Sequence, residues 1–186
     1  FTVSERSHGR SETTAVGEGA AFLHGTSENM VLKAAQRLYE AAGKEFPGWD
    51  LTISAAIPLA RGLGSSASAV VGGLVAANAL LGDPFDADAL LAHATAMEGH
   101  PDNVAPALRG GLTVAMEAEG RVITRPLQAA ALPEFVVAVP EFELSTEVAR
   151  KALPSVVSHQ DAVYNIARVT LLTTALAAGQ LEWLAD

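Results

Sequence analysis

The chain has 186 residues, enough for one domain with a hydrophobic core, or for one domain and part of another. Acidic residues outnumber basic ones by 21 to 12, and the net charge of −9 argues against nucleic acid as the main partner. Cysteine is absent and every apolar run is too short to cross a membrane, so we expect a cytoplasmic protein without disulfides or membrane helices.

The first third of the sequence predicts strands around one amphipathic helix. Two short polar stretches within residues 1–20 predict an edge hairpin. Ser27 is the expected N-cap of a helix over residues 28–42, and Gly43 is its expected stop. Alternating apolar residues over 49–57 predict a strand. The chain begins with a residue other than Met and has no signal pattern, so we expect an interior piece of a longer protein.

Three helices are predicted next, over residues 67–81, from Asp86 as N-cap to Met97, and over 104–108. Apolar runs then predict a meander of three strands, over 112–118, 122–126 and 135–139. Pro140 marks the expected domain boundary, and helices are expected from about Ser145 and over 161–178. The mixture of strands and helices predicts an α/β fold.

Between the expected strand and the next helix lies the loop Pro58-Leu-Ala-Arg-Gly-Leu-Gly-Ser-Ser-Ala-Ser68. Gly62 and Gly64 can take positive φ and allow a ligand to approach the backbone. Ser65 and Ser66 fall at the helix start, where unpaired amides favour an anion such as phosphate. A Walker A loop is excluded because no lysine occurs between Lys44 and Lys151. A dinucleotide-binding loop is disfavoured because this sequence lacks the acidic residue that should follow about 20 positions later. A turn with a purely structural role remains an open interpretation.

The complete string resembles P-x-x-x-G-L-G-S-S-A, the second motif of the GHMP kinases, a family that includes galactokinase, homoserine kinase and mevalonate kinase. The resemblance implies an ATP site in a fold like ribosomal protein S5 domain 2, over residues 1–139, followed by the start of a ferredoxin-like domain over 140–186. It also implies the following triphosphate-binding residues: Pro58, Arg61, Gly62, Leu63, Gly64, Ser65, Ser66 and Ala67.

A second segment, residues 97–111, resembles the homoserine kinase string E…H-x-D-N-V-A-P-A…G-G. By this resemblance Glu98 and Ser66 hold Mg²⁺, while His100, Asp102 and Asn103 line the pocket of the alcohol that accepts the phosphate. We expect Asp102 to bind a substrate ammonium group, with transfer that needs no general base. The residues alone favour an ordinary carboxylate at a helix end for Glu98 and a structural role for His100.

Two further strings complete the resemblance. Residues 140–150 are similar to P-x-x-x-x-S-T-x-x-A-R, which places Thr146 and Arg150 four positions apart on one helical face. With Asn103 they are the expected acceptor-side residues of the transfer, since arginine holds a carboxylate through two parallel hydrogen bonds. Asn29 resembles the family residue beside adenine, although a polar residue at a helix start is an equal explanation.

The homoserine kinase resemblance implies ATP-dependent phosphorylation of L-homoserine, with Mg²⁺, in threonine biosynthesis. A GHMP kinase for mevalonate or a sugar, a non-catalytic ligand sensor with the same fold, and a structural α/β domain are the open alternatives. We expect no nucleic-acid or membrane partner, and the sequence leaves a homodimer open.

Overall fold

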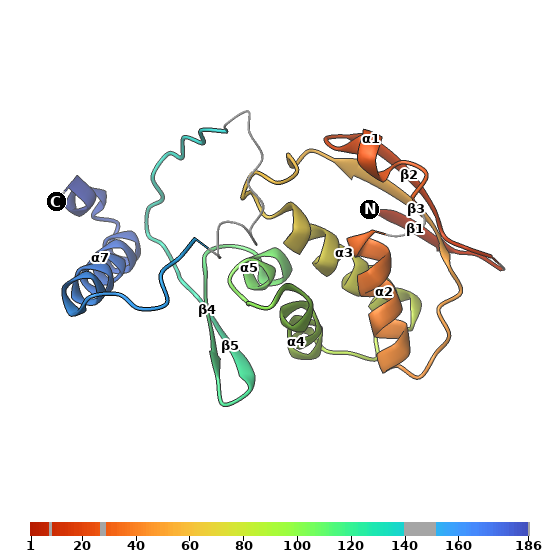
Figure 1. Ribbon diagram of the computed structural model, residues 1–186. Helices are drawn as coiled ribbons and strands as arrows, with labels where there is room; N and C mark the ends of the chain where they lie inside the picture. The colour runs from red at the N-terminus through yellow and green to blue at the C-terminus, as the bar shows by residue number, and fades with distance from the viewer. Residues whose placement is uncertain (8, 27–28, 140–151, 186) are drawn as a thin grey trace.

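The computed structural model describes residues 1–7, 9–26, 29–139 and 152–185. Its three-stranded sheet consists of β1 (Thr2–Glu5), β2 (Glu12–Gly17) and β3 (Trp49–Ala55). β3 lies in the middle, antiparallel to β1 and parallel to β2 (Figure 1). The expected hairpin of the first two strands is therefore wrong. The more apolar β3 lies between them, and a central strand can form backbone hydrogen bonds along both of its edges.

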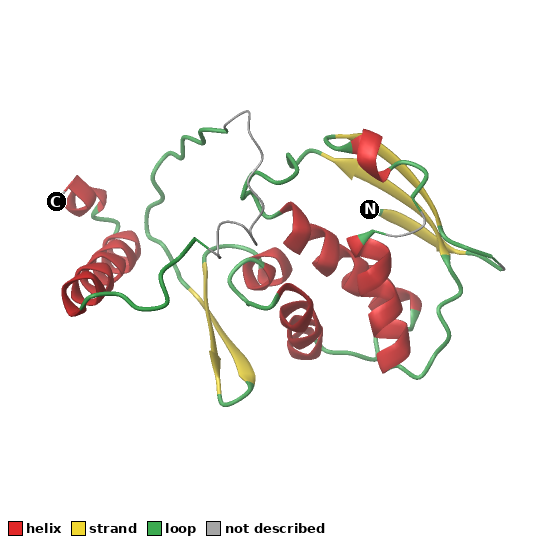
Figure 2. Cartoon of the chain, in the orientation of Figure 1, coloured by secondary structure: helices red, strands yellow, loops and turns green. Residues whose placement is uncertain are grey.

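Helices cover one side of this sheet. They are α2 (Met30–Ala41), α3 (Ser65–Leu80), α4 (Ala87–Glu98) and the short α5 (Val104–Arg109), while α1 (Ala20–Leu23) follows β2. Figure 2 shows α2 and α3 beside the strands, with α4 and α5 farther from them. The hydrophobic core lies between these helices and the inner face of β3, with buried residues from α2, α3, α4 and α5. The β3 side chains of that core are Trp49, Leu51 and Ile53.

α2 has the expected buried face but a different start. Asn29, rather than Ser27, is its N-cap, and the Asn29 side chain accepts a hydrogen bond of 3.1 Å from the Leu32 amide. Asparagine caps helices as well as serine does, and here its position matches the first helical turn. Ser27 itself lies outside the described residues. The predicted face of the helix is buried, as the following residues show: Val31, Ala34, Ala35 and Leu38.

α2 and α3 approach each other closely because Gly73 has no side chain. A Cβ on Gly73 would lie 2.3 Å from the backbone oxygen of Val31 and 2.9 Å from the Cβ of Ala34. The two helices are thus in direct contact at a glycine and an alanine. This close packing lets α3 bury Val70 and Leu74 fully.

The hairpin of β4 (Thr113–Ala118) and β5 (Arg121–Pro126) confirms the first two strands of the predicted meander. The third, over residues 135–139, is wrong, since this stretch has no regular secondary structure. Val136 is 97% exposed, and no strand in the described ranges pairs with this stretch. An apolar run forms a strand only where a neighbouring strand accepts its backbone hydrogen bonds.

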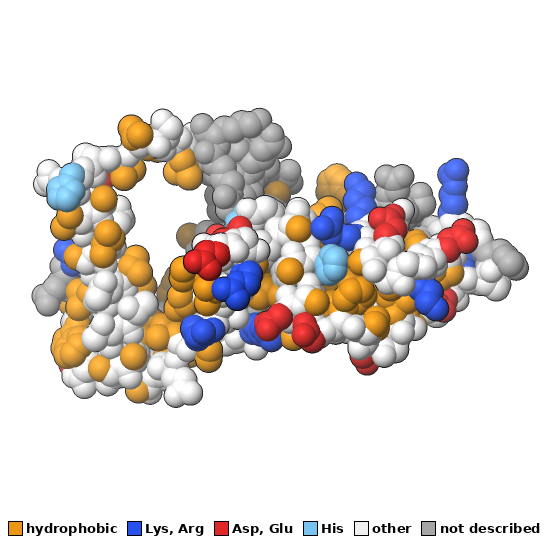
Figure 3. Space-filling view, turned by 90° about the horizontal axis from the view of Figure 1, so that it is seen from below, with side chains coloured by type: hydrophobic (Ala, Val, Ile, Leu, Met, Phe, Trp, Pro, Cys, Tyr) orange, Lys and Arg blue, Asp and Glu red, His pale blue; other side chains and the backbone are white. Residues whose placement is uncertain are grey.

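The chain ends in α7 (His159–Ala178) and a 3₁₀ helix, η1 (Leu181–Ala185). Of the α7 residues, only Ala175 and Leu176 are buried, next to Ala130, whose amide donates to the Leu176 carbonyl at 2.9 Å. Figure 3 shows hydrophobic side chains over the end of the molecule that carries α7. The expected domain boundary at Pro140 and the helix from Ser145 fall outside the described residues. No helix within the described ranges has the length and hydropathy to span a bilayer.

Candidate phosphate-binding site

The glycine loop follows directly from the central strand. β3 ends at Ala55, and positive φ angles occur at Ala60 (54°), Gly62 (70°) and Gly64 (79°), at every second residue. Such turns aim successive N–H groups into one concavity, which is an anion-binding arrangement. A Cβ on Gly62 or Gly64 would meet no atom within 4 Å, so the φ angles, rather than lack of space, explain the glycines.

The amides at the start of α3 have no protein acceptor in the described part of the chain. Gly64 is the N-cap and makes no side-chain cap bond, and the first helical hydrogen bond runs from the Ser68 amide to the Gly64 carbonyl, at 2.9 Å. Within the described ranges, no carbonyl accepts a hydrogen bond from the amides of residues 62–67. These amides, with the positive end of a 16-residue helix, favour a negative ligand.

The structure brings Ser66 and Glu98 together, although they are far apart in sequence. The Ser66 hydroxyl donates a hydrogen bond to Oε1 of Glu98, the last residue of α4. Gly99 ends α4 in the left-handed conformation, with φ at 80°. A hydroxyl and a carboxylate are hard oxygen ligands, and Mg²⁺ commonly uses one or two protein ligands together with waters and substrate phosphates. This donor set therefore fits the ion, even though no cluster of three metal-binding side chains occurs in the described residues.

A hollow of about 550 Å³ opens beside the loop, and we call it the apolar hollow. Its hydrophobic lining includes Leu23, Met30, Ile53, Ile57 and Leu59. Its polar lining consists of Asn29, Ser54, Ser65, Ser66 and Ser68. A mostly apolar hollow with a few polar groups in its lining is typical of a small-molecule site.

Asn29 lies at this hollow and is already engaged by the protein. Its Nδ2 donates to the Thr13 hydroxyl at 3.1 Å, while its Oδ1 caps α2. A primary amide has two donor hydrogens and two acceptor lone pairs, so these two bonds use half of that capacity. The structural explanation of Asn29 is therefore observed, and a contact with adenine stays a prediction.

His100, Asp102 and Asn103 form a short connection between α4 and α5. Nδ1 of His100 contacts Oδ1 of Asp102, and Asn103 Nδ2 donates to the same oxygen at 3.3 Å. Asn103 also lines a second hollow, which we call the α5 hollow, together with Gly62 and Gly64. One predicted acceptor residue, Asn103, is thus placed at the glycine loop; it is hydrogen-bonded to Asp102, which His100 contacts in turn.

The structure shows fewer contacts for the remaining predicted site residues, and two of them are not described. Arg61 is half-buried, and its guanidinium lies 3.4 Å from the carbonyl oxygen of Ala60. Pro58 and Leu63 lie in the loop, and Ala67 is buried in the first turn of α3. Thr146 and Arg150 lie outside the described residues, so their expected position stays a prediction.

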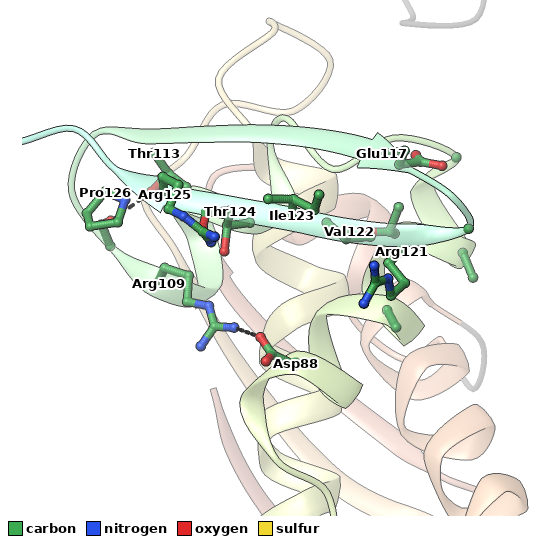
Figure 4. A pocket seen from close by; sticks show the side chains of 16 residues that line it. Asp88, Arg109, Thr113, Glu117, Arg121, Val122, Ile123, Thr124, Arg125 and Pro126 are labelled. Atoms are coloured by element: carbon green, nitrogen blue, oxygen red, sulfur yellow. Dashed lines mark hydrogen bonds and ion pairs between the residues drawn. The ribbon is translucent and has the colours of Figure 1, made fainter.

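Sequence reasoning gave no sign of a larger hollow, of about 1150 Å³, between the β4–β5 hairpin and helices α4 and α5 (Figure 4). Arg109 reaches into it and is held by an ion pair with Asp88, and Arg121 and Arg125 also line it. These residues form no known motif, and none of the predicted site residues lines this hollow.

Residues 29–111 match the family model described as GHMP kinases N terminal domain. A curated homoserine kinase from Synechococcus sp. is 45% identical over 188 residues, which cover 100% of this chain and 61% of that protein. One from Moorella thermoacetica is 43% identical over 171 residues, 92% of this chain and 58% of that protein. The chain thus spans about three fifths of the length of these curated relatives.

The chain is also similar to solved structures of a homoserine kinase and of a phosphomevalonate kinase. A homoserine kinase from Cytophaga hutchinsonii matches with a TM-score of 0.77 at 26% identity, over 98% of this chain and 59% of that one. A Streptococcus pneumoniae phosphomevalonate kinase, solved with phosphomevalonate and AMPPNP, shares the fold with a TM-score of 0.68 at 14% identity, over 98% of this chain and 65% of that one. The expected mixed α/β fold is confirmed. The glycine loop, the helix that it opens and these likenesses agree: residues 29–111 match the N-terminal domain of the GHMP kinases, and the chain is similar to homoserine kinases.

Proposed function

We propose that the whole protein transfers the γ-phosphoryl group of ATP to the side-chain hydroxyl of L-homoserine, which yields O-phospho-L-homoserine on the route to threonine. The observation that carries the proposal is the contact of Ser66 with Glu98 at the start of α3, beside backbone amides that have no described protein acceptor. The names of the relatives, which are homoserine kinases at more than 40% identity, support the choice of substrate.

In this proposal the triphosphate binds the amides of residues 62–67, and the adenosine enters the apolar hollow past Asn29. Ser66 and Glu98 hold Mg²⁺, which supplies neutralising charge to the phosphates when bound. The hydrogen bond between them keeps the two oxygen ligands next to each other before the ligand arrives. Local positive potential from the helix start allows a protein of net charge −9 to attract a polyphosphate.

The amino acid lies on the opposite side of the loop in this proposal. Asn103 lines the α5 hollow, and Asp102 binds the substrate ammonium group, with its Oδ1 held by His100 and Asn103. Thr146 and Arg150 supply a hydroxyl and a guanidinium, the latter for the substrate carboxylate. Transfer then depends on alignment of the hydroxyl and on charge stabilisation, which dominate phosphoryl transfer.

The test is Mg²⁺-dependent ADP release by the whole protein with homoserine, mevalonate, galactose and 4-hydroxybutyrate, which lacks the ammonium group. We expect turnover with homoserine and much weaker turnover with 4-hydroxybutyrate. Glu98→Gln should lower kcat/KM by about 10²–10³, the usual effect of losing one group that stabilises transition-state charge. The matched control, Glu45→Gln, changes an exposed carboxylate after α2 and should have no effect.

Other outcomes separate the alternatives. Turnover with mevalonate or galactose but not with homoserine would make the protein a different small-alcohol kinase. ATP binding without turnover on any alcohol would favour a ligand sensor. Absence of ATP binding would overturn the role of the glycine loop.

A further inference from the structure

Ser68 lies in the first turn of α3, next to the predicted phosphate-binding residues but not among them. It is half-buried, and its amide makes the first hydrogen bond of the helix. Ser68 lines both the apolar hollow and the α5 hollow. The two hollows share only two other lining residues, Phe1 and Ile57, which are apolar. Within the described structure, Ser68 is thus the one polar side chain at the junction of the two hollows.

The junction is where the proposed reaction needs a polar group. If ATP occupies the apolar hollow and the alcohol faces Asn103 in the α5 hollow, the transferred phosphoryl group lies between them. Productive alignment places the reacting atoms about 3–3.5 Å apart, so donor and acceptor must meet at the shared lining. Helical side chains lean toward the N-terminus of their helix, and the Ser68 hydroxyl therefore leans toward the loop amides.

The hydroxyl of Ser68 has no hydrogen-bond partner among the described residues. Hydroxyls in helices commonly bond the carbonyl one turn earlier, as those of Thr170, Thr173 and Thr174 in α7 do. The nearby Ser66 hydroxyl is used by Glu98. A half-buried helical hydroxyl that makes neither kind of bond is available as a donor to a ligand in the hollows.

We propose that Ser68 contacts the substrate and donates a hydrogen bond to an oxygen of the phosphoryl group during transfer. The inference rests on the proposed function, because it places the nucleotide and the alcohol in the two hollows. No covalent bond to Ser68 forms, and its proton stays on its own oxygen. The hydroxyl acts only by stabilising charge on the phosphoryl oxygens in the transition state.

The experiment compares Ser68→Ala, Ser68→Thr and the control Ser4→Ala in the whole protein. Ser4 is an exposed residue of β1, so its variant makes the same chemical change away from both hollows. We expect Ser68→Ala to lower kcat by about 10- to 100-fold, below the full effect of an oxyanion donor, because the loop amides remain. The KM values for ATP and homoserine should stay within about twofold, and Ser68→Thr, which keeps a hydroxyl, should restore most of kcat.

Three results would overturn the inference. The first is a kcat of Ser68→Ala within about twofold of the wild type. The second is a loss confined to a higher KM for ATP, which indicates a ground-state contact or a structural role. The third is equal loss in the alanine and threonine variants. A wild-type protein that turns over no alcohol would instead overturn the proposed function, and this contact with it.

Discussion

The part of the chain before residue 127 and the part after it use their hydrophobic residues in different ways. In the described structure, every buried hydrophobic side chain except Ala175 and Leu176 lies in the first part. α7 instead exposes an apolar series: Val163, Tyr164, Ile166, Val169 and Leu172. A hydrophobic pattern therefore produces a core only where a second element covers it. The glycine loop, Ser66, Glu98 and Asn103 all belong to the well-packed part.

The largest expected difference between the two parts is the cost of removing a leucine side chain. Leu38 in α2 is fully buried, whereas Leu172 in α7 is 44% exposed. Leu38→Ala should lower the free energy of unfolding of the 186-residue chain by about 2–5 kcal/mol, because it leaves a cavity. Leu172→Ala should change it by less than about 0.5 kcal/mol. Urea denaturation measures both, and equal losses would show that α7 belongs to the same cooperative core.

A smaller effect is expected at the seam between α2 and α3. Gly73→Ala places a Cβ against the Val31 backbone oxygen, so the helices must separate or distort. We expect a loss of about 1–3 kcal/mol in the free energy of unfolding, the usual cost of overpacking. The control Val75→Ala changes a side chain of the same helix that is 43% exposed. It should stay within about 0.5 kcal/mol. A neutral Gly73→Ala in the same denaturation experiment would mean that the seam is looser than described.

The smallest effect should distinguish the helix caps of the two parts. Asp86 caps α4 through the Ala89 amide at 2.8 Å, and Ser158 caps α7 through the Asp161 amide at 3.1 Å. Asp86→Ala should lower the free energy of unfolding by about 0.5–2 kcal/mol, since α4 packs on the core. Ser158→Ala should leave the main unfolding transition unchanged and increase hydrogen exchange in the first turn of α7. If both variants lowered the stability seen in the main unfolding transition, α7 would belong to the same cooperative unit as the core.

Local signals predicted the elements whose hydrogen bonds are local. Asp86 was expected as a cap and is one, and the buried face of α2 followed from its periodicity. The predicted start of α2 was wrong because Ser27 and Asn29 are both good N-cap residues, and only packing selects between them. The β1–β2 hairpin was wrong because strand order depends on contacts between residues distant in sequence.

The local part of the site was also predictable from the sequence, whereas contacts between distant residues were not. The left-handed glycines and the serine-rich helix start came from the loop sequence itself. The meeting of Ser66 with Glu98 spans 32 residues, and only the family resemblance, rather than spacing, paired them. Ser68 is the last residue of the loop string, but no contact was predicted for it, because its place at the two hollows depends on how α5 packs against α3.

The glycine contact between α2 and α3 also limits how the site can move. Packed helices in many proteins adjust to ligands through shear, in which they slide along each other by small side-chain rearrangements. At Gly73 the backbone of one helix faces the other directly, and no flexible side chain is present there to accommodate sliding. Any closure of the site around a ligand should therefore come from rotation about backbone angles in residues 56–64, while α3 stays a rigid base.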